Sequence, residues 1–331
     1  MESTRNRLIQ LLDKSDGYIS GQQLSDKLNI SRTAVWKHMK ELEKDGYEIE
    51  AIQRKGYRIL SSPDKVSENT VQWGLDTNWL GHQLFHYKEV PSTQDIAHQL
   101  AKQNKPHGTV VIADEQVKGK GRMSRPWHSP KGKGIWMSIL LRPDLVPVQA
   151  PQLTLLAATV LAEVFGEEEK IAPQIKWPND ILISHKKVSG ILTEMQAEHD
   201  QIQYVVLGIG INVNQTSEEI PEELRKKASS LRIESEQIWP ITDTIKKLLH
   251  QFEVTYDQFM AHGFQHVKKL WEKYGYRIGE KVTIKTMKKE WEAVLVGIEP
   301  DGALRARDFN GNEEKLYSAE IQWGEGGYNA D

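Results

Sequence analysis

The sequence predicts an α+β protein in three parts, and three observations lead to this fold class. Residues 1 to about 62 follow the pattern of three short helices and a hairpin, typical of a winged helix-turn-helix domain. In residues 67–270, strands at 109–116 and 135–141 are joined by a loop without a helix, which indicates antiparallel pairing in a mixed sheet. Residues 274–325 alternate in short strands between turns, which predicts a small β-barrel.

The central part has the clearest sequence of elements. Polar residues 61–66, "SSPDKV", predict a linker before it. Helices are expected at 93–103, 151–165 and 241–260, and strands at 84–90, 109–116, 135–141, 181–184, 188–195 and 204–213. The strands are not regularly separated by helices, so a doubly wound nucleotide-binding fold is disfavoured.

Composition excludes several classes of protein. The 331 residues carry a net charge of −3 and 38% hydrophobic residues, as a soluble globular protein does. No run of roughly 18 apolar residues or signal-peptide core occurs, so we expect a cytoplasmic protein without a membrane partner. With no cysteine, a thioester intermediate and Cys-ligated zinc are excluded. The absence of an H-E-x-x-H motif gives no reason to expect a built-in metal site.

The first 62 residues carry a basic surface on one helix. Ser20 with Gln23 predicts a capping box for the second helix, and Ser31 caps the third, whose inward face holds Val35, Met39 and Leu42. The outward face of the third helix has no acid before Glu41, which suits a recognition helix in a DNA major groove. The expected DNA-binding residues are Arg32, Thr33, Trp36, Lys37 and Lys40, with Arg54 and Lys55 at the tip of the wing. Such domains generally bind paired half-sites, so a homodimer is expected.

Residues 117–134, "VKGKGRMSRPWHSPKGKG", form a glycine-rich basic loop. No acid occurs between Gln116 and Asp144. The loop begins like the dinucleotide-binding motif G-x-G-x-x-G, but Ser124 replaces the third glycine and Pro126 prevents a following helix. The loop does not match the other standard phosphate motif, G-x-x-x-x-G-K-[ST], either. Its glycines still allow backbone amides to approach an anion. The pattern alone leaves two interpretations open: an anion-binding loop, or a surface strip that touches nucleic acid.

Three further stretches favour a small-molecule site. "KWPND", residues 176–180, gathers a cation, a ring, an amide and a carboxylate at one strand end. Lys186 and Lys187 precede a strand in which Gly190 permits close approach of the backbone. Gly208, Gly210 and Asn212 interrupt an apolar strand, and glycines there indicate a ligand lying against it.

These stretches, with "STQDIA", "GKGRMSRPWHSP", "KVSGILTE" and "GIGINVN" in this order and spacing, resemble the biotin-protein ligases. With the helix-turn-helix in front, essentially the whole chain resembles the bifunctional biotin ligases and biotin-operon repressors of bacteria. The resemblance implies a central catalytic domain of the biotin/lipoate ligase type and an SH3-like C-terminal barrel.

The resemblance also implies which residues form the site. Arg122 and Lys187 would be catalytic. The biotin pocket would comprise Ser92, Thr93, Gln94, Gln116, Gly119, Lys120, Gly121, Arg122, Lys187 and Gly190; ATP would meet Arg122, Lys176, Asn179, Asp180, Lys187 and Asn212. This chain departs from the common pattern in Lys120, which stands where many members have arginine, in Met123–Ser124 after the key arginine, and in Pro126. Because lysine lacks the bidentate geometry of arginine, we expect contact through the backbone at 120.

The implied reaction explains the charges. A biotin carboxylate must attack the α-phosphate of ATP, and two anions repel in a dry site. Arg122 and Lys187 would neutralise this charge, Mg²⁺ would accompany the pyrophosphate, and Asp180 would orient Lys176 or reach the metal. The loop would close over the labile biotinyl-5'-adenylate, and the lysine of a carrier protein would attack it without an enzyme nucleophile.

The leading hypothesis is therefore a biotin-protein ligase that also represses biotin genes, with biotinyl-5'-adenylate as co-repressor. Its partners would be the biotin carboxyl carrier domains of biotin-dependent carboxylases, operator DNA, and a second copy of the chain in a ligand-promoted homodimer. Two alternatives are a catalytically inactive biotin-sensing regulator and a lipoate-protein ligase. The intact Arg122, Lys187, Asn179 and Asn212 argue against the first, and the N-terminal domain and G-K-G-R loop against the second.

Overall fold

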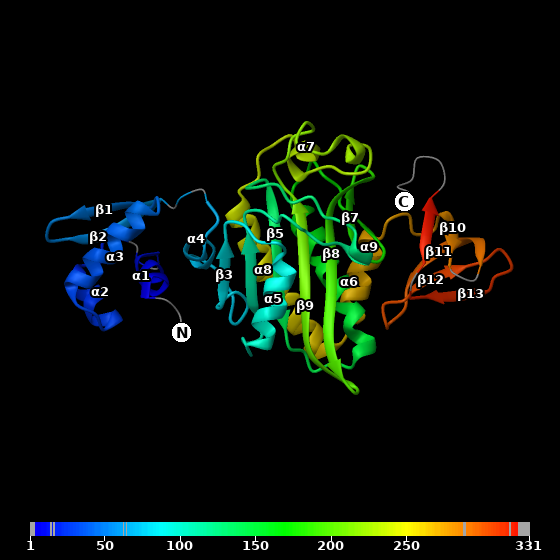
Figure 1. The fold of residues 1–331 in the computed structure, drawn as a ribbon, viewed down its shortest axis with the longest axis horizontal. Helices are drawn as coiled ribbons and strands as arrows, with labels where there is room; N and C mark the ends of the chain where they lie inside the picture. The colour runs from blue at the N-terminus through cyan, green and yellow to red at the C-terminus, as the bar shows by residue number, and fades with distance from the viewer. Residues whose placement is uncertain are drawn as a thin grey trace.

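The computed structural model describes residues 4–13, 15, 17–61, 63, 65–286, 289–317 and 319–323. It has three sheets: a two-stranded hairpin, a seven-stranded central sheet and a five-stranded C-terminal sheet. Figure 1 shows them in a row, with the N-terminal helices at one end and the C-terminal sheet at the other. The expected linker 61–66 includes Ser62 and Asp64, which lie outside the described residues. The predicted α+β class is confirmed.

The N-terminal region has the predicted helices and hairpin. Ser20 caps α2 through a capping box with Gln23, and the Ser31 side chain accepts from the Ala34 amide at the start of α3. Val35, Met39 and Leu42 are buried in a cluster separate from the rest of the protein. The elements are α1 (Thr4–Asp13), α2 (Gly21–Leu28), α3 (Arg32–Lys44), β1 (Glu48–Ile52) and β2 (Gly56–Ser61).

The central sheet has the order β3-β4-β5-β9-β8-β7-β6, in which only β3 and β4 pair in parallel. Its strands are β3 (Leu84–Tyr87), β4 (Thr109–Ala113), β5 (Gly134–Leu141), β6 (Gln174–Lys176), β7 (Asp180–Ile183), β8 (Lys186–Glu198) and β9 (Gln201–Asn212). The glycine-rich loop joins the antiparallel neighbours β4 and β5, as predicted.

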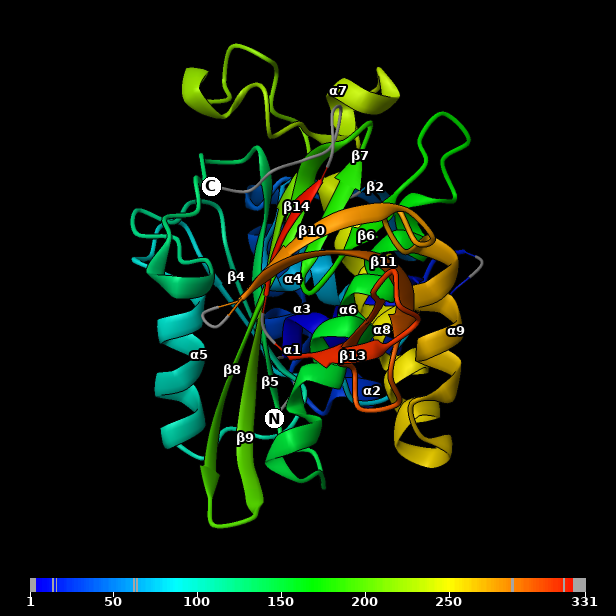
Figure 2. The ribbon, with the colours of Figure 1, turned by 90° about the vertical axis from the view of Figure 1, so that its right-hand side faces the viewer.

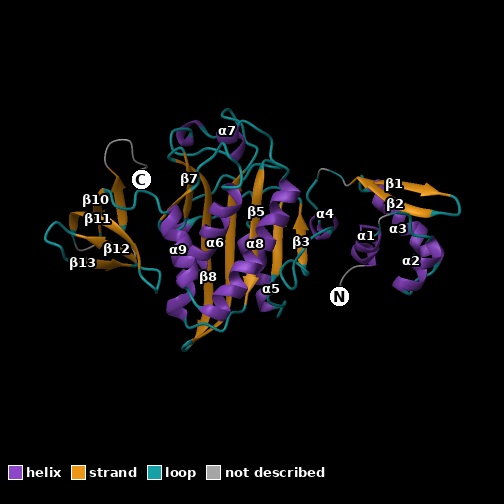
Figure 3. Ribbon diagram, turned by 180° about the vertical axis from the view of Figure 1, so that it is seen from behind, coloured by secondary structure: helices purple, strands orange, loops and turns teal. Residues whose placement is uncertain are grey.

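Helices cover both faces of this sheet (Figures 2 and 3). One face packs on α5 (Thr93–Lys102), where Ala97 and Leu100 meet Val111 and Val206. The opposite face packs on α6 (Ala150–Phe165), α8 (Ile241–His262) and α9 (Gln265–Tyr274). Residues 147–165 are long and apolar enough to cross a membrane, but 72% of this stretch is buried in the protein. We interpret it as the central core helix.

The C-terminal sheet shares the core of the central region. Its strands, in the order β13-β12-β11-β10-β14, are β10 (Lys281–Lys285), β11 (Glu290–Ile298), β12 (Leu304–Arg307), β13 (Glu313–Leu316) and β14 (Glu320–Trp323). Ile284, Leu295 and Leu304 belong to the same buried cluster as α6 and the central strands. Gln152 of α6 also donates to the Pro300 carbonyl at 2.8 Å. The barrel is therefore packed on the central region.

Two short helices complete the fold: α4 (Glu68–Gln72) and α7 (Leu231–Ser235). Trp73, which follows α4, connects the N-terminal core to the central region. Its ring lies 5.6 Å from the ring of Tyr47, and the Lys246 ammonium of α8 lies 5.7 Å from it on the central side. A single ring thus contacts both parts of the protein.

The buried carboxylate of Glu253 on α8 fixes the chain segment before β3. It accepts hydrogen bonds from the backbone amides of Asn78, Trp79 and Leu80 at 2.5, 2.8 and 2.7 Å. Burial acts to raise the pKa of Glu253, but these backbone donors together hold it below its usual value of 4.5. The charged form is therefore favoured in the folded protein.

We predict that Glu253→Gln lowers the free energy of unfolding by about 2 kcal/mol at pH 7, because charge-assisted bonds to three amides are weakened. Because the pKa of Glu253 is lower in the folded protein than in the unfolded chain, its charged carboxylate stabilises the folded protein at pH values above the unfolded pKa. This stabilisation is lost as the pH falls through the folded-state pKa. The difference between the variant and the native protein should therefore shrink below about pH 4. Urea unfolding across pH measures it, with the exposed Glu223→Gln as control; a difference that does not change with pH contradicts the assignment.

Candidate functional site

The start of α5 forms one wall of the site. The Ser92 side chain caps the helix and accepts from the Gln94 amide at 3.3 Å. The next residue, Thr93, donates its backbone amide to Gln116 Oε1 at 2.8 Å, and its hydroxyl lies 2.8 Å from the Ser138 hydroxyl of β5. The predicted pocket residues Ser92, Thr93, Gln94 and Gln116 are therefore in mutual contact. Ser138 was not predicted, because a single serine in an apolar strand gives no signal in the sequence.

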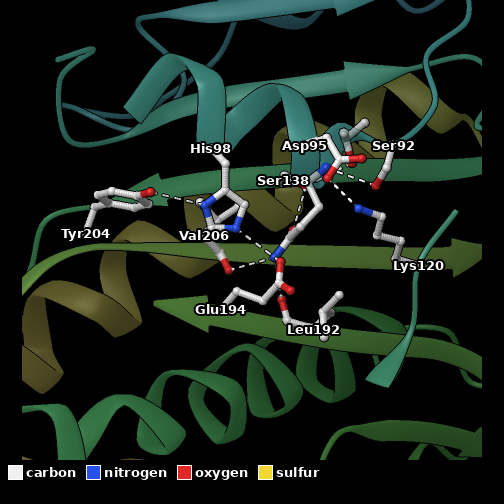
Figure 4. A network of polar contacts seen from close by, with 11 residues as sticks. Ser92, Asp95, His98, Lys120, Ser138, Leu192, Glu194, Tyr204 and Val206 are labelled. Atoms are coloured by element: carbon white, nitrogen blue, oxygen red, sulfur yellow. Dashed lines mark hydrogen bonds and ion pairs between the residues drawn. The ribbon is translucent and has the colours of Figure 1, made fainter. Parts of the chain in front are cut away.

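The Gln94 amide is fixed by hydrogen bonds to Ser138, Leu192 and Val206 of the central sheet, which Figure 4 labels. Its Nε2 donates to the carbonyls of Val206 and Leu192 at 3.1 and 3.4 Å, and its Oε1 accepts from Ser138 at 3.1 Å. A Cβ at Gly208 would lie 2.5 Å from Oε1. Gly208 therefore accommodates the Gln94 side chain, and both polar atoms of the Gln94 amide already have hydrogen-bond partners within the protein.

The glycine-rich loop folds back on itself above this wall. Its base is closed by Gln116, which donates to the Ser129 hydroxyl at 3.0 Å, and its arms are joined by bonds from the Gly121 amide to Arg125 and from the Trp127 amide to Gly119. At the tip, Met123 and Ser124 both have positive φ, 54° and 60°. Ser124 thus adopts the left-handed conformation for which a glycine would be the ordinary residue.

Trp127 fills the space above the strand glycines. A Cβ at Gly210 would lie 2.5 Å from its indole Nε1, and one at Gly190 would lie 3.2 Å from its ring. The Lys187 ammonium lies 5.0 Å from the ring, and Nε1 is buried without a hydrogen-bond partner in the described part of the protein. In this structure Gly190, Gly208 and Gly210 make room for Trp127, Lys187 and Gln94, and contact of these glycines with a ligand stays a prediction. The sequence shows that these positions lack a Cβ atom, but it does not show which side chain occupies the space.

Basic side chains gather around one carboxylate next to this pocket. Asp180 lies opposite Lys176 in the β6–β7 register, and its Oδ1 is 2.7 Å from Lys187 Nζ. Burial lowers the pKa of Lys176 to about 8; Asp180 opposes this, while Lys187, Lys227 and Arg125 add to it. The expectation that Asp180 serves Lys176 is therefore incomplete, because Lys187 is its ion-pair partner.

Arg122 connects the loop to the "KWPND" segment. Its Nη1 donates to Asn179 Oδ1 at 3.3 Å, and Asn179 Nδ2 donates to the Ile191 carbonyl at 2.8 Å. Desolvation lowers the pKa of Arg122, and Asp180 raises it. Asn212 lies on the neighbouring strand and donates to the Ser229 carbonyl at 2.9 Å. Of the side chains predicted for ATP, Arg122 and Asn179 are therefore in contact, and Lys187 pairs with Asp180.

Two predicted residues have other roles in this structure. The Lys120 side chain pairs with Asp95 of α5, with Nζ 2.5 Å from Oδ1, which is compatible with the expected backbone contact at 120. Trp177, the ring of the "KWPND" segment, is buried and donates to the Gly302 carbonyl of the barrel at 3.3 Å. Asp95 and the position of Trp127 were missed, since neither stands out in the sequence.

The expected DNA-binding side chains lie together on the surface of the N-terminal region. Arg32, Thr33, Trp36, Lys37 and Lys40 of α3 are exposed, as are Arg54 and Lys55 at the turn between β1 and β2. Lys40 Nζ lies 2.6 Å from Glu43 on the same helix. DNA contact by Lys40 would therefore compete with this ion pair.

In the described residues no group of three or more His, Asp or Glu side chains is arranged to hold a metal ion. Asp180 is the carboxylate that lies among the cations of the site, and it is engaged by Lys187. Such a site suits a metal that arrives with phosphates, because Mg²⁺ is typically bound by one or two carboxylates together with substrate oxygens.

Comparisons with known proteins agree with this arrangement. Residues 87–212 match the biotin/lipoate A/B protein ligase family, and residues 4–58 match an HTH domain. The chain is 47% identical to the bifunctional ligase/repressor BirA of Bacillus spizizenii over 98% of this chain and 100% of the relative. It is 27% identical to BirA of Escherichia coli K12, over 95% of this chain and 97% of that one.

Among solved structures, biotin protein ligase from Aquifex aeolicus in complex with biotin and ATP is similar, with a TM-score of 0.63 and 31% identity. The match covers 72% of this chain and 97% of the Aquifex chain. Together with the nearly full-length relatives, the fold and the site place this chain in the family of bifunctional biotin-protein ligases and repressors.

Proposed function

We propose that the protein activates biotin with ATP to biotinyl-5'-adenylate, transfers biotin to a lysine of a carrier protein, and represses biotin genes with the adenylate as co-repressor. The observation that carries this proposal is the group of basic side chains around Asp180, together with the contacts that hold Thr93, Gln94 and Gln116 at the start of α5. A site with more cations than acids suits a reaction in which a carboxylate and a triphosphate must meet.

The side chains support specific roles. Thr93 and Gln116 would hold biotin, and Trp127 would cover it. Lys187 and Arg122 would neutralise the carboxylate and the α-phosphate as charge develops on the pentacoordinate phosphorus. Asn179 and Asn212 would orient the nucleotide. The loop above the pocket would exclude water from the mixed anhydride until the acceptor lysine attacks its acyl carbon and AMP leaves.

Mg²⁺ would supply charge neutralisation on the departing pyrophosphate, with Asp180 as the nearby carboxylate. The pKa of Lys176 is lowered to about 8, so at any pH below that value Lys176 is protonated in more than half of the molecules. We therefore place it as a phosphate contact and not as a base.

The regulatory part of the proposal depends on the N-terminal domain. We infer that two copies of the chain bind a paired operator through α3 and the wing, that the adenylate promotes this dimer, and that the protein acts in the cytoplasm. The carrier would be the biotin carboxyl carrier domain of a biotin-dependent carboxylase.

One assay tests the central claim. The protein is incubated with ATP, Mg²⁺, a biotin carrier domain and either biotin or lipoate, and the carrier mass is measured. We expect biotinylated carrier, no lipoylated carrier and no product without ATP. Absence of product supports the inactive biotin-sensing regulator if the protein still binds biotin, and lipoylation alone supports the lipoate ligase.

Arg122→Ala should release preformed biotinyl-5'-adenylate at least about tenfold faster than the native protein, because a charge-assisted contact worth roughly 1.5–3 kcal/mol is lost. Release is followed by chasing labelled adenylate with excess unlabelled ligand. Lys131→Ala, an exposed cation of the same loop, is the matched control. If release from the Arg122 variant equals that from the control, Arg122 does not hold the adenylate.

Lys37→Ala should weaken operator binding without changing ligation, and the slope of log affinity against log salt should fall by about one. Lys40→Ala should have a smaller effect, because Glu43 already neutralises part of its charge. Fluorescence anisotropy with operator DNA at several salt concentrations measures both variants. An unchanged slope for Lys37→Ala shows that α3 does not contact the DNA phosphates.

A further inference from the structure

The glycine-rich loop is attached to two different elements of the central region. Near its first arm, Lys120 Nζ lies 2.5 Å from Asp95 Oδ1 on α5. At its tip, Arg122 donates to Asn179 at 3.3 Å, between β6 and β7. Strands β9 and β8, whose Gly210 and Gly190 lie under Trp127, are between these two anchors. The loop is therefore held across the pocket from one side to the other.

The loop cannot neutralise its own cations, because it contains no acid. Its basic residues must find partners on other elements or remain solvated. Asp95 is the acid in the first turn of α5, where the helix dipole also favours a negative charge. It follows directly on Thr93 and Gln94, which line the pocket. One helical turn thus provides both the pocket wall and the partner of the loop (Figure 4).

Asp95 also lies close to where two anionic substrates would bind. An unpaired carboxylate there would repel them, whereas a carboxylate paired with Lys120 presents no net charge. The side chains of Asp95 and Lys120 are 40% and 45% exposed, so the pair is worth little to global stability. Its effect should instead be local, because it joins the first arm of the loop to a rigid helix, whereas the Arg122–Asn179 bond and the Lys133–Glu219 ion pair hold the tip and the far end.

We propose that Asp95 is a positioning residue: through Lys120 it holds the loop closed over the pocket and prolongs the retention of the bound adenylate. It does not contact the reacting atoms. This inference rests on the proposed function only for the identity of the retained ligand, since attachment of the loop by the ion pair is a property of the protein alone.

The test uses the full chain with Asp95→Asn, Lys120→Met, Lys120→Arg and the charge-reversed pair Asp95→Lys/Lys120→Asp. Two quantities are measured: hydrogen exchange of the Gly121 and Trp127 amides without ligand, and the release rate of preformed biotinyl-5'-adenylate. The expected increase for Asp95→Asn and Lys120→Met is about two- to fivefold in both, the range open to an exposed ion pair. Lys120→Arg should behave like the native protein, and Lys131→Met is the matched control.

Reversing the pair should bring both quantities back to within about twofold of the native values, and 1 M salt should remove most of the difference between the native protein and Asp95→Asn. The rate of adenylate formation at saturating substrates should not change in Asp95→Asn, whose side chain belongs to neither the expected biotin residues nor the expected ATP residues, and this separates positioning from catalysis. The inference is overturned if loop exchange is unchanged in Asp95→Asn and Lys120→Met, or if the reversed pair restores nothing. A native protein that forms no adenylate refutes the proposed function, while the exchange measurement still decides whether the pair holds the loop.

Discussion

The carboxylate of Asp180 lies among several basic side chains, and the arrangement of the site depends on these contacts. Asp180 pairs with Lys187, faces Lys176 across a strand pair and favours the charged form of Arg122. Burial and the surrounding cations nevertheless lower the pKa of Lys176 to about 8. Clustered cations repel one another unless an anion joins them. The charges around Asp180 therefore support the proposal that a carboxylate and a polyphosphate meet here.

The sequence predicts the parts of the fold that depend on local chemistry. Ser20 and Gln23 form their capping box because the bond requires only a short peptide segment, and Val35, Met39 and Leu42 are buried because their spacing places them on one helix face. The antiparallel pairing of β4 and β5 is predicted for a similar reason, since the two apolar strands are joined by a loop without a crossover helix. These elements need no knowledge of distant residues.

The missed parts of the site depend on contacts between distant segments. A glycine in a strand shows that a Cβ is not tolerated, but the atom that takes its place comes from elsewhere in the chain: Trp127 for Gly210 and Gln94 for Gly208. Asp95 is likewise one of many acids in the sequence until folding brings it to Lys120. Among the candidate residues from the resemblance, Thr93 contacts Gln116 and Arg122 contacts Asn179, and the structure adds side chains such as Ser138 that hold them.

The barrel and the N-terminal domain differ in how they are joined to this site. The N-terminal helices have a core of their own, and Trp73 contacts both that core and α8. The barrel shares the central core, and Trp177, two residues before Asn179, donates to the Gly302 carbonyl of the barrel. Gly302 has a φ of 87°, and a Cβ there would lie 2.9 Å from Leu155 of α6, so this turn fits closely against the core helix. The segment that carries Asn179 and Asp180 is therefore supported from outside the central sheet, and separating the barrel would leave the Trp177 indole, and with it this segment, without that support.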